Sequence, residues 1–339
     1  MTDDEVRRLR MGGQRLEPRA SGGAVDVVRA VCGIQAQDAA AARLSVRVRS
    51  TGLTAAGVDA EPGLVRTWAW RGTLHLLATE DAPWILSLVA GPRVRGAGAR
   101  WRQLGLDEAL YARARDALAA VVAEAPRTRA ELRAALAAEG IDATGQRLPH
   151  LVARAAVEGV LVAGLDDTYR AYRNAPPPAR DEAIAELARR YLAAYGPAEP
   201  RDLAAWSGLP AADVRAAWAT LEGRLEEVAV RGRPAWVLAG AVAPPPPAEP
   251  VVRLLPAFDT ALLGHRSRDL IVDRERARRV WPGGGWLHPV LLVDGRAAGT
   301  WRASRGRVTV EPFAPLPERA RAALDAEMAD VARFSAAGA

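Results

Sequence analysis

The sequence predicts an α+β fold, mainly α, in which tandem winged helix-turn-helix units, three in all, precede a small C-terminal β-domain and a terminal helix. Three observations predict this fold. A pattern of three helices and a strand pair occurs twice, short alternating strands gather beyond residue 250, and proline-rich stretches at 175–178 and 244–247 separate these regions. We therefore expect four units, at 1–100, 101–178, 179–243 and 250–339.

The N-terminal unit has the least regular pattern. We expect its helices from about residue 3, over 24–32 and over 39–49, and the segment 65–77 has the strand character of a wing. These elements fit a third winged helix.

The second unit shows the pattern most clearly. Thr128-Arg129-Ala130-Glu131 is a capping-box sequence, which predicts a helix start, and Gly140 and Gly159 are typical of helix ends. Asp166-Asp167 predicts a turn between two strands. The expected elements are helices at 108–124, 128–138 and 146–158 and strands at 160–163 and 168–172.

The third unit repeats this order, and the C-terminal unit departs from it. In the third unit we expect helices at 181–195, 200–206 and 210–221 and strands at 225–230 and 234–238. In the C-terminal unit we expect strands at 289–293, 296–302 and 307–312 and a closing helix at 316–334.

Composition narrows the functional classes. The chain has 46 basic residues, all arginine, and 40 acidic residues, for a net charge of +6, which permits a polyanionic partner. Without lysine, neither a lysine Schiff base nor a Walker-type phosphate contact is available, and the N-terminal amine is the only alternative. The single cysteine, Cys32, excludes a disulfide framework and a cysteine-rich zinc site.

The sequence also lacks the usual motifs for metal binding, nucleotide binding and serine hydrolase chemistry. The four histidines stand at no metal-ligand spacing, and neither a glycine-rich phosphate loop nor Gly-x-Ser-x-Gly occurs, so we expect no metal and no cofactor. No apolar run reaches the length of a membrane span and no signal segment opens the chain. We therefore expect a cytoplasmic protein.

Winged helices usually bind duplex DNA, with the third helix near the groove and the wing along the backbone. The third helix and wing of the second unit carry basic side chains at Arg147, His150, Arg154, Arg170 and Arg173. The wing of the next unit adds Arg231 and Arg233. These residues are candidate DNA contacts; the alternatives are ordinary solvated side chains or a protein–protein module.

One connection between helices has an unusual composition, Gly33-Ile34-Gln35-Ala36-Gln37-Asp38. Gly33 is expected to end one helix and Asp38 to cap the next. In the extended backbone between them, Gln35 and Gln37 point the same way and can bind one water or one ligand group. The alternative is that both amides bind nearby backbone.

This segment resembles the Gln-x-Gln motif of the AlkZ-like winged-helix DNA glycosylases, a family that also contains YcaQ. Three further segments match the family's pattern in the same order: Trp70-Arg71-Gly72-Thr73-Leu74-His75, Leu255-Pro256-Ala257-Phe258-Asp259 continuing through Gly264 to Arg268, and Gly299-Thr300-Trp301-Arg302. The resemblance covers about residues 1–310. It implies three tandem winged helices and a C-terminal β-domain arranged around DNA.

The resemblance also implies a chemistry, the excision of alkylated bases, notably N7-alkylguanine, and of interstrand crosslinks. An N7-alkylated guanine is already cationic and leaves C1′ readily, so the main requirement is a positioned water. By resemblance, the carbonyl oxygens of Gln35 and Gln37 orient that water. The YcaQ branch has Asp at the second position, so Gln37 indicates the AlkZ branch. Asp38 is expected to cap a helix rather than to catalyse, because adjacent side chains face apart.

The segment around Arg71 gives further candidates. Arg71 and His75 are expected on one face of a strand, where they contact phosphate or the lesion strand, or are merely solvated. Trp68 and Trp70 alternate similarly, and core packing is favoured over base stacking.

The C-terminal motifs are expected to be largely structural. A structural role is expected for Phe258, Asp259 and Arg268. An Asp–Arg pair among them would hold the β-domain to its neighbours. Trp301 and Arg302 lie on one strand, where one packs and Arg302 is a candidate phosphate contact.

The resemblance, together with the absence of lysine, therefore implies a monofunctional DNA glycosylase that removes N7-alkylated purines and unhooks crosslinks, without lyase activity. A tethered base cannot rotate fully out of the duplex, so an open site is expected rather than a deep pocket. The expected partner is double-stranded DNA with alkylation damage, bound by a monomer at the nucleoid. The alternatives are a winged-helix transcriptional regulator, indifferent to Gln35 and Gln37, and an inactive relative that only binds damaged DNA.

Overall fold

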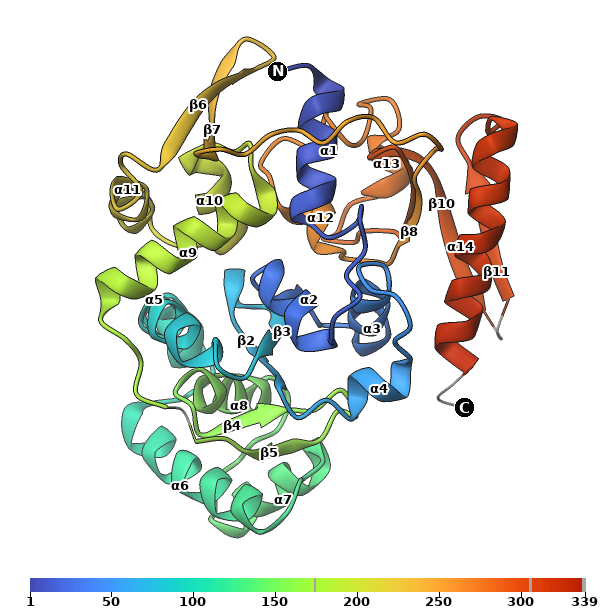
Figure 1. Cartoon of the computed structure of the whole chain (residues 1–339). Helices are drawn as coiled ribbons and strands as arrows, with labels where there is room; N and C mark the ends of the chain where they lie inside the picture. The colour runs from blue at the N-terminus through green and yellow to red at the C-terminus, as the bar shows by residue number, and fades with distance from the viewer. Residues whose placement is uncertain (174, 305–306, 337–339) are drawn as a thin grey trace.

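Helices surround three small antiparallel sheets in the computed structural model, which describes residues 1–173, 175–304 and 307–336 (Figure 1). Capping explains where several helices begin. The box predicted at Thr128 is present, because the Thr128 side chain accepts from the backbone of Glu131 and the Glu131 side chain accepts from that of Thr128. A second capping box, at Thr2 and Glu5, opens the first helix.

The N-terminal region contains more elements than expected. Its elements are α1 (Asp3–Gly13), α2 (Ala24–Ala30), β1 (Ile34–Gln35), α3 (Ala39–Arg47), α4 (Ala55–Asp59), β2 (Leu64–Trp68), the 3-10 helix η1 (Trp70–Gly72), β3 (Leu74–Ala78) and α5 (Ala82–Gln103). The segment 65–77, expected to have the strand character of a wing, contains the two strands β2 and β3. The chain forms a hairpin there, because it reverses direction at η1, where Arg71 has φ 53° and Gly72 has φ 69°.

The three-helix and hairpin order is observed in both central regions. Residues 101–178 contain α6 (Glu108–Glu124), α7 (Arg129–Ala138), α8 (Arg147–Val157), β4 (Leu161–Ala163) and β5 (Tyr169–Ala171). Residues 179–243 contain α9 (Arg180–Tyr195), α10 (Pro200–Ser207), α11 (Ala211–Ala219), β6 (Leu225–Val230) and β7 (Arg233–Leu238). The two proline-rich stretches expected as linkers carry no helix or strand.

One sheet joins the N-terminal region to the next. Its strand order is β1-β3-β2-β4-β5, and β2 meets β4 where Arg66 lies opposite Ala163. Arg66 reinforces this junction, since its guanidinium donates to the Gly164 carbonyl at 2.9 Å and to Asp167 at 2.7 Å. The first two regions therefore share a continuous sheet.

The C-terminal region forms a separate sheet in the order β11-β10-β9-β8. Its elements are β8 (Val252–Leu255), α12 (Thr260–Leu263), α13 (Ala277–Val280), β9 (Val290–Val293), β10 (Arg296–Ser304), β11 (Arg307–Pro312) and α14 (Glu318–Ala336). The closing helix α14 runs beside this sheet (Figure 1). Three of these strands and the closing helix were predicted, whereas β8 was not.

Ionic and apolar contacts attach this region to the N-terminal one. Asp259 accepts two hydrogen bonds from Arg49, at 2.7 and 2.8 Å, and both side chains are fully buried. Asp259 thus forms an Asp–Arg pair that holds the β-domain to its neighbours, as predicted, but its partner is Arg49 and not Arg268. Arg268 instead lies over the ring of Trp281, because its loop turns away toward α13. Arg47 adds a second buried pair with Glu327 at 2.9 Å.

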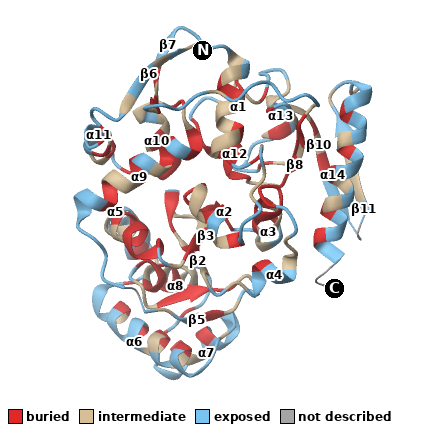
Figure 2. Cartoon of the chain, in the orientation of Figure 1, coloured by how far each residue is buried: buried red, intermediate tan, exposed pale blue. Residues whose placement is uncertain are grey.

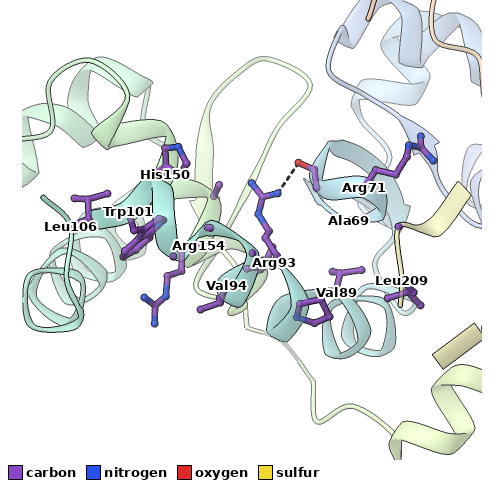
Figure 3. Close-up of a pocket in the computed structure, with 18 of the residues that line it drawn as sticks. Ala69, Arg71, Val89, Arg93, Val94, Trp101, Leu106, His150, Arg154 and Leu209 are labelled. Atoms are coloured by element: carbon purple, nitrogen blue, oxygen red, sulfur yellow. Dashed lines mark hydrogen bonds between the residues drawn. The ribbon is translucent and has the colours of Figure 1, made fainter. Parts of the chain in front are cut away.

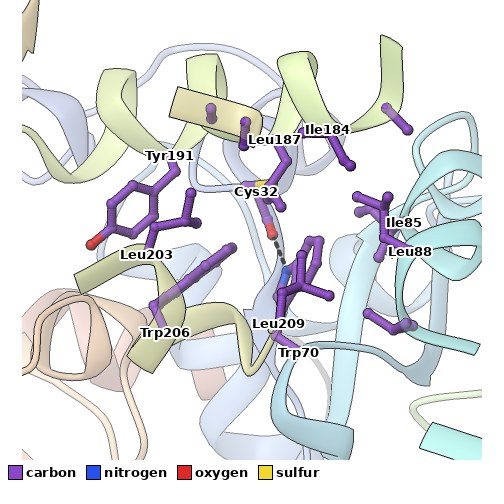
Figure 4. Packing of buried hydrophobic residues seen from close by; sticks show 14 of the residues in the cluster. Cys32, Trp70, Ile85, Leu88, Ile184, Leu187, Tyr191, Leu203, Trp206 and Leu209 are labelled. Atoms are coloured by element: carbon purple, nitrogen blue, oxygen red, sulfur yellow. Dashed lines mark hydrogen bonds between the residues drawn. The ribbon is translucent and has the colours of Figure 1, made fainter. Parts of the chain in front are cut away.

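An aromatic cluster fills the largest core, between α5, α9, α10 and η1 (Figure 4). Trp70 is fully buried, as expected, and its ring lies 5.0 Å from that of Trp206. Figure 2 shows buried residues on the faces that line these junctions and exposed residues on the outer faces. This core packs η1, which contains Trp70, against α10, which contains Trp206.

Candidate active site

The backbone before the two glutamines follows a path that requires glycine. After α2, Cys32 has φ 57° and Gly33 has φ 101°, and β1 begins at the next residue. A Cβ atom at Gly33 would lie 2.7 Å from Cδ2 of Leu77. The indole nitrogen of Trp70 donates to the Cys32 carbonyl at 2.9 Å. These contacts fix the start of the motif against β3 and η1.

The side chains of Gln35 and Gln37 meet on one side of the connection, as expected. Nε2 of Gln35 donates to Oε1 of Gln37 at 2.8 Å. Gln35 is only 8 % exposed, whereas Gln37 is exposed. Asp38 caps α3 by accepting from the Ala41 amide at 3.0 Å, which confirms its predicted role. The pair therefore has a buried member and a member that faces solvent.

Arg71 completes this arrangement from a different position than expected. It lies in the η1 turn and not on a strand with His75, because the segment folds back there. Its Nη2 atom donates to Oε1 of Gln35 at 3.0 Å, and its Nη1 atom donates to the carbonyl of Trp206 in α10. The resulting chain of hydrogen bonds runs from Trp206 through Arg71 and Gln35 to Gln37.

His75 lies next to this pair but inside the fold. It is opposite Gln35 in the β1–β3 register, it is 3 % exposed, and its Nδ1 lies 3.0 Å from the Thr73 carbonyl. Burial, followed by the positive charge of Arg71, lowers the pKa of His75 to about 3, so the ring is neutral near pH 7. A ring this buried offers little surface to a phosphate, which argues against the expected DNA contact of His75.

The basic residues of α8 differ in how freely they can bind another molecule. Arg154 donates to both oxygens of Glu108, at 2.7 and 2.8 Å, and to Glu158 at 2.9 Å, and it lies over the Tyr111 ring. These contacts give Arg154 a structural role. Arg147 lies 3.8 Å from Asp142, and His150 is half-buried in a cavity wall.

The remaining predicted DNA contacts lie on exposed hairpins. Arg170 on β5 and Arg173 after it are exposed. Arg231 and Arg233, at the β6–β7 turn, pair with Asp3 at 2.5 Å and with Glu199 at 3.2 Å. Arg302 on β10 pairs with Glu311 at 2.8 Å. None of these pairs is buried, so solvent or a polyanion competes for them readily.

A basic cavity of about 650 Å³ lies between η1, α5 and α8 (Figure 3). Arg93 crosses it to donate to the Gly72 carbonyl at 2.8 Å. Burial, with Arg100 and Arg93 nearby, lowers the pKa of His150 at its wall. The basic lining residues are Arg71, Arg93, Arg102, His150 and Arg154. Arg93 and Arg102 were not predicted, because α5 contains Pro92 and three glycines and shows no clear helical pattern.

A second basic cavity, of about 670 Å³, lies between α1, α10, the β6–β7 turn and α13. Its basic lining residues are Arg10, Arg201, Arg231, Arg233, His265, Arg266, Arg268 and Arg278, against the acidic Glu199, Asp202 and Asp269. Neither Gln35 nor Gln37 lines this cavity or the first one, as far as the described residues define them. The glutamine pair thus lies outside these cavities.

The described residues lack two kinds of feature. Within 1–173, 175–304 and 307–336, no three His, Cys, Asp or Glu side chains are grouped so that they could hold a metal ion. No helix in this part of the chain is long and apolar enough to cross a membrane.

Comparisons with known proteins agree with one another. The family model described as DNA glycosylase AlkZ-like matches residues 28–334. An interstrand DNA cross-link repair glycosylase from Streptomyces sahachiroi is 32 % identical over 363 aligned positions, which cover 98 % of this chain and 96 % of that protein. The solved structure of the Streptomyces sahachiroi DNA glycosylase AlkZ superposes with a TM-score of 0.83 at 30 % identity, covering 99 % of this chain and 97 % of that one.

Proposed function

Because this chain belongs to the AlkZ-like family of DNA glycosylases, we propose that it removes N7-alkylated purines from duplex DNA and unhooks interstrand crosslinks. The observation that carries the proposal is the hydrogen-bonded pair of buried Gln35 and exposed Gln37, within a chain that is similar along its length to a crosslink repair glycosylase.

The pair has only to orient a water for attack on C1′. An N7-alkylated guanine leaves as a neutral base, so its departure needs no strong acid, and a water must then attack C1′. Each glutamine oxygen has two lone pairs. Arg71 occupies one on Gln35 and Gln35 occupies one on Gln37, so each oxygen retains one acceptor site with which to orient water. Orientation of this kind is a substantial source of rate enhancement.

We propose that base removal ends at an abasic site. A glycosylase that also cuts the strand needs an amine nucleophile, and this chain has no lysine. The amine of Met1 donates to the Ala229 carbonyl at 2.8 Å, on the β6–β7 hairpin. An intact strand with a missing base is therefore the expected product.

We further propose that crosslinks are substrates because the site is open. Gln37 is exposed and neither glutamine lines a cavity among those described, so a base tethered to its partner strand need not enter a closed pocket. A deep pocket at Gln37 would have required the tethered base to drag its partner strand.

For DNA binding, we propose that regions 1–100, 101–178 and 179–243 are three winged helices that hold the duplex as a monomer, with 250–339 as a separate β-domain, and that the protein acts on nucleoid DNA. Support comes from the repeated helix and hairpin order and from exposed arginines on the hairpins. The proposed phosphate contacts are Arg147, Arg170, Arg173, Arg231, Arg233 and Arg302.

The proposal is tested with duplex oligonucleotides that carry one N7-methylguanine or one guanine–guanine crosslink. The expected result is release of free base with time, an intact strand before alkali and strand cleavage after it. Cleavage before alkali would contradict the monofunctional assignment. Binding to undamaged duplex with sequence selectivity and without base release would contradict the glycosylase proposal.

A further inference from the structure

The amide of Gln35 is hydrogen-bonded at both ends. Its oxygen accepts from Arg71 at 3.0 Å, and its nitrogen donates to Gln37 at 2.8 Å. A guanidinium only donates hydrogen bonds, so the atom of Gln35 that faces Arg71 must be the oxygen. The nitrogen of Gln35 then faces Gln37, which must present its own oxygen. Arg71 therefore determines the orientation of both amides.

The two glutamines are unequal in their access to solvent. Gln35 is 8 % exposed, and both ends of its amide already have partners. Gln37 is exposed, and its oxygen keeps one free lone pair. A water that attacks DNA from solvent meets Gln37 first, and Gln35 links Gln37 to Arg71.

Contacts with α10 and α5 hold Arg71 in the position from which it binds Gln35. Its Nη1 atom donates to the Trp206 carbonyl, and a Cβ atom on Gly208, just after α10, would lie 3.1 Å from the Arg71 Cα. Arg93 holds the next carbonyl of the same turn, and Trp70 ties the turn to Cys32. Figure 3 shows Arg93 reaching this turn, whereas the Arg71 side chain extends away from Arg93.

The backbone of Arg71 points to a specific requirement at this position. Its φ of 53° lies in the left-handed region, which non-glycine residues occupy mainly where the surroundings enforce it, and such positions cluster at functional sites. Gly72 follows immediately with a φ of 69°, so two successive residues of this turn are left-handed, and the first of them is not a glycine.

We propose that Arg71 is a positioning residue, which orients Gln35 and through it the carbonyl oxygen of Gln37 toward the attacking water. This inference rests on the proposed function. It differs from a phosphate contact in what the guanidinium binds: one N–H of each outer nitrogen of Arg71 donates to a protein oxygen, that of Trp206 or that of Gln35.

The variant Arg71→Met removes the donors and keeps an unbranched side chain that extends as far as the position of the arginine Nε. Misplacement of a reacting group by about 1 Å lowers a rate by about a hundredfold, so we expect a ten- to hundredfold loss of the single-turnover rate of N7-methylguanine release. The Kd for the lesion duplex and the salt slope of binding should not change. Arg71→Lys, which keeps the charge but can reach only one of the two acceptors, should recover part of the rate.

A double-mutant cycle tests the connection to Gln37. In a Gln37→Ala background, Arg71→Met should add less than a threefold loss, because the solvent-facing Gln37 oxygen that Arg71 orients through Gln35 is gone. Because Arg71→Met could disturb folding, Arg71→Ala is also measured with added guanidinium at low millimolar concentration. Rescue by guanidinium, and not by equal sodium chloride, supports positioning. Arg115→Met, on the exposed face of α6, is the control and should match wild type.

Three outcomes overturn the inference, and they separate it from the proposed function. A rise in Kd with a salt slope reduced by about 0.9, at an unchanged rate, would make Arg71 a phosphate contact and leave the proposed function standing. A rate loss that is fully additive with Gln37→Ala would remove the link between the two residues. If Gln37→Ala itself leaves base release unchanged, the proposed site and the inference both fail.

Discussion

The buried pair of Arg49 and Asp259 gives the sharpest stability prediction. Asp259 accepts from Arg49 twice, from the Ser45 hydroxyl at 2.7 Å and from the Ala261 amide at 3.0 Å, and neither charged side chain is exposed. The substitution Asp259→Asn keeps the shape but removes the negative charge. Arg49 would then be a buried cation without a counterion.

The expected cost follows from this burial. Removing one partner of a buried ion pair costs about 3–5 kcal/mol, because the remaining charge is desolvated without compensation. At roughly 2 °C per kcal/mol for a chain of this size, the thermal midpoint should fall by about 6–10 °C. The double variant Arg49→Met with Asp259→Leu should lose less than Asp259→Asn, because no charge remains buried.

Thermal and urea unfolding followed by circular dichroism measure this effect. The matched control is Asp116→Asn, which breaks the pair with Arg115 on the surface of α6 and should leave the midpoint unchanged. If Asp259→Asn has no larger effect than Asp116→Asn, or if the double variant is less stable than the single one, the assignment of this pair as a buried clamp is wrong.

Three further predictions concern pH, backbone and salt. Burial lowers the folded pKa of His75 to about 3 and that of His265 well below 6.5, so the unfolded chain takes up protons first as pH falls. The free energy of unfolding should therefore fall below about pH 6.5, by up to about 1.4 kcal/mol per histidine and pH unit, and an unchanged urea midpoint between pH 7 and 5 would contradict this. Gly33→Ala should destabilise more than Gly52→Ala, because both have positive φ but only Gly33 faces Leu77, and equal unfolding midpoints would refute the overlap. Affinity for undamaged duplex, from fluorescence anisotropy, should fall steeply with salt, whereas a flat dependence would exclude the arginine contacts.

Local signals allowed much of the fold to be predicted. The capping box at Thr128 and the turn around Asp166-Asp167 depend on a few neighbouring residues, and the structure confirms the elements they delimit. The missed helix α5 contains Pro92 and glycines, so its sequence gives a weak helical pattern. The missed pairing of β2 with β4 joins residues about a hundred positions apart, which no local pattern reveals.

The candidate site was predicted only in part, because local spacing determines some of its contacts and packing between distant residues determines the others. The spacing of Gln35 and Gln37 in extended backbone predicts that their side chains meet, and they do. The contact from Arg71 depends on a turn that strand periodicity does not predict and on the carbonyl of Trp206 in another unit. Long-range packing, rather than local propensity, places the residue that orders the pair.

The role proposed for the glutamine pair in base release can be measured directly. It is tested most directly by single-turnover release of N7-methylguanine from a duplex, comparing wild type with Gln37→Ala, the Gln35→Ala/Gln37→Ala double variant and the control Gln103→Ala on the exposed end of α5. We expect Gln103→Ala to match wild type and the variants of the pair to lose about a hundredfold or more, with DNA affinity unchanged. Release at the wild-type rate by the double variant would show that the water is positioned elsewhere.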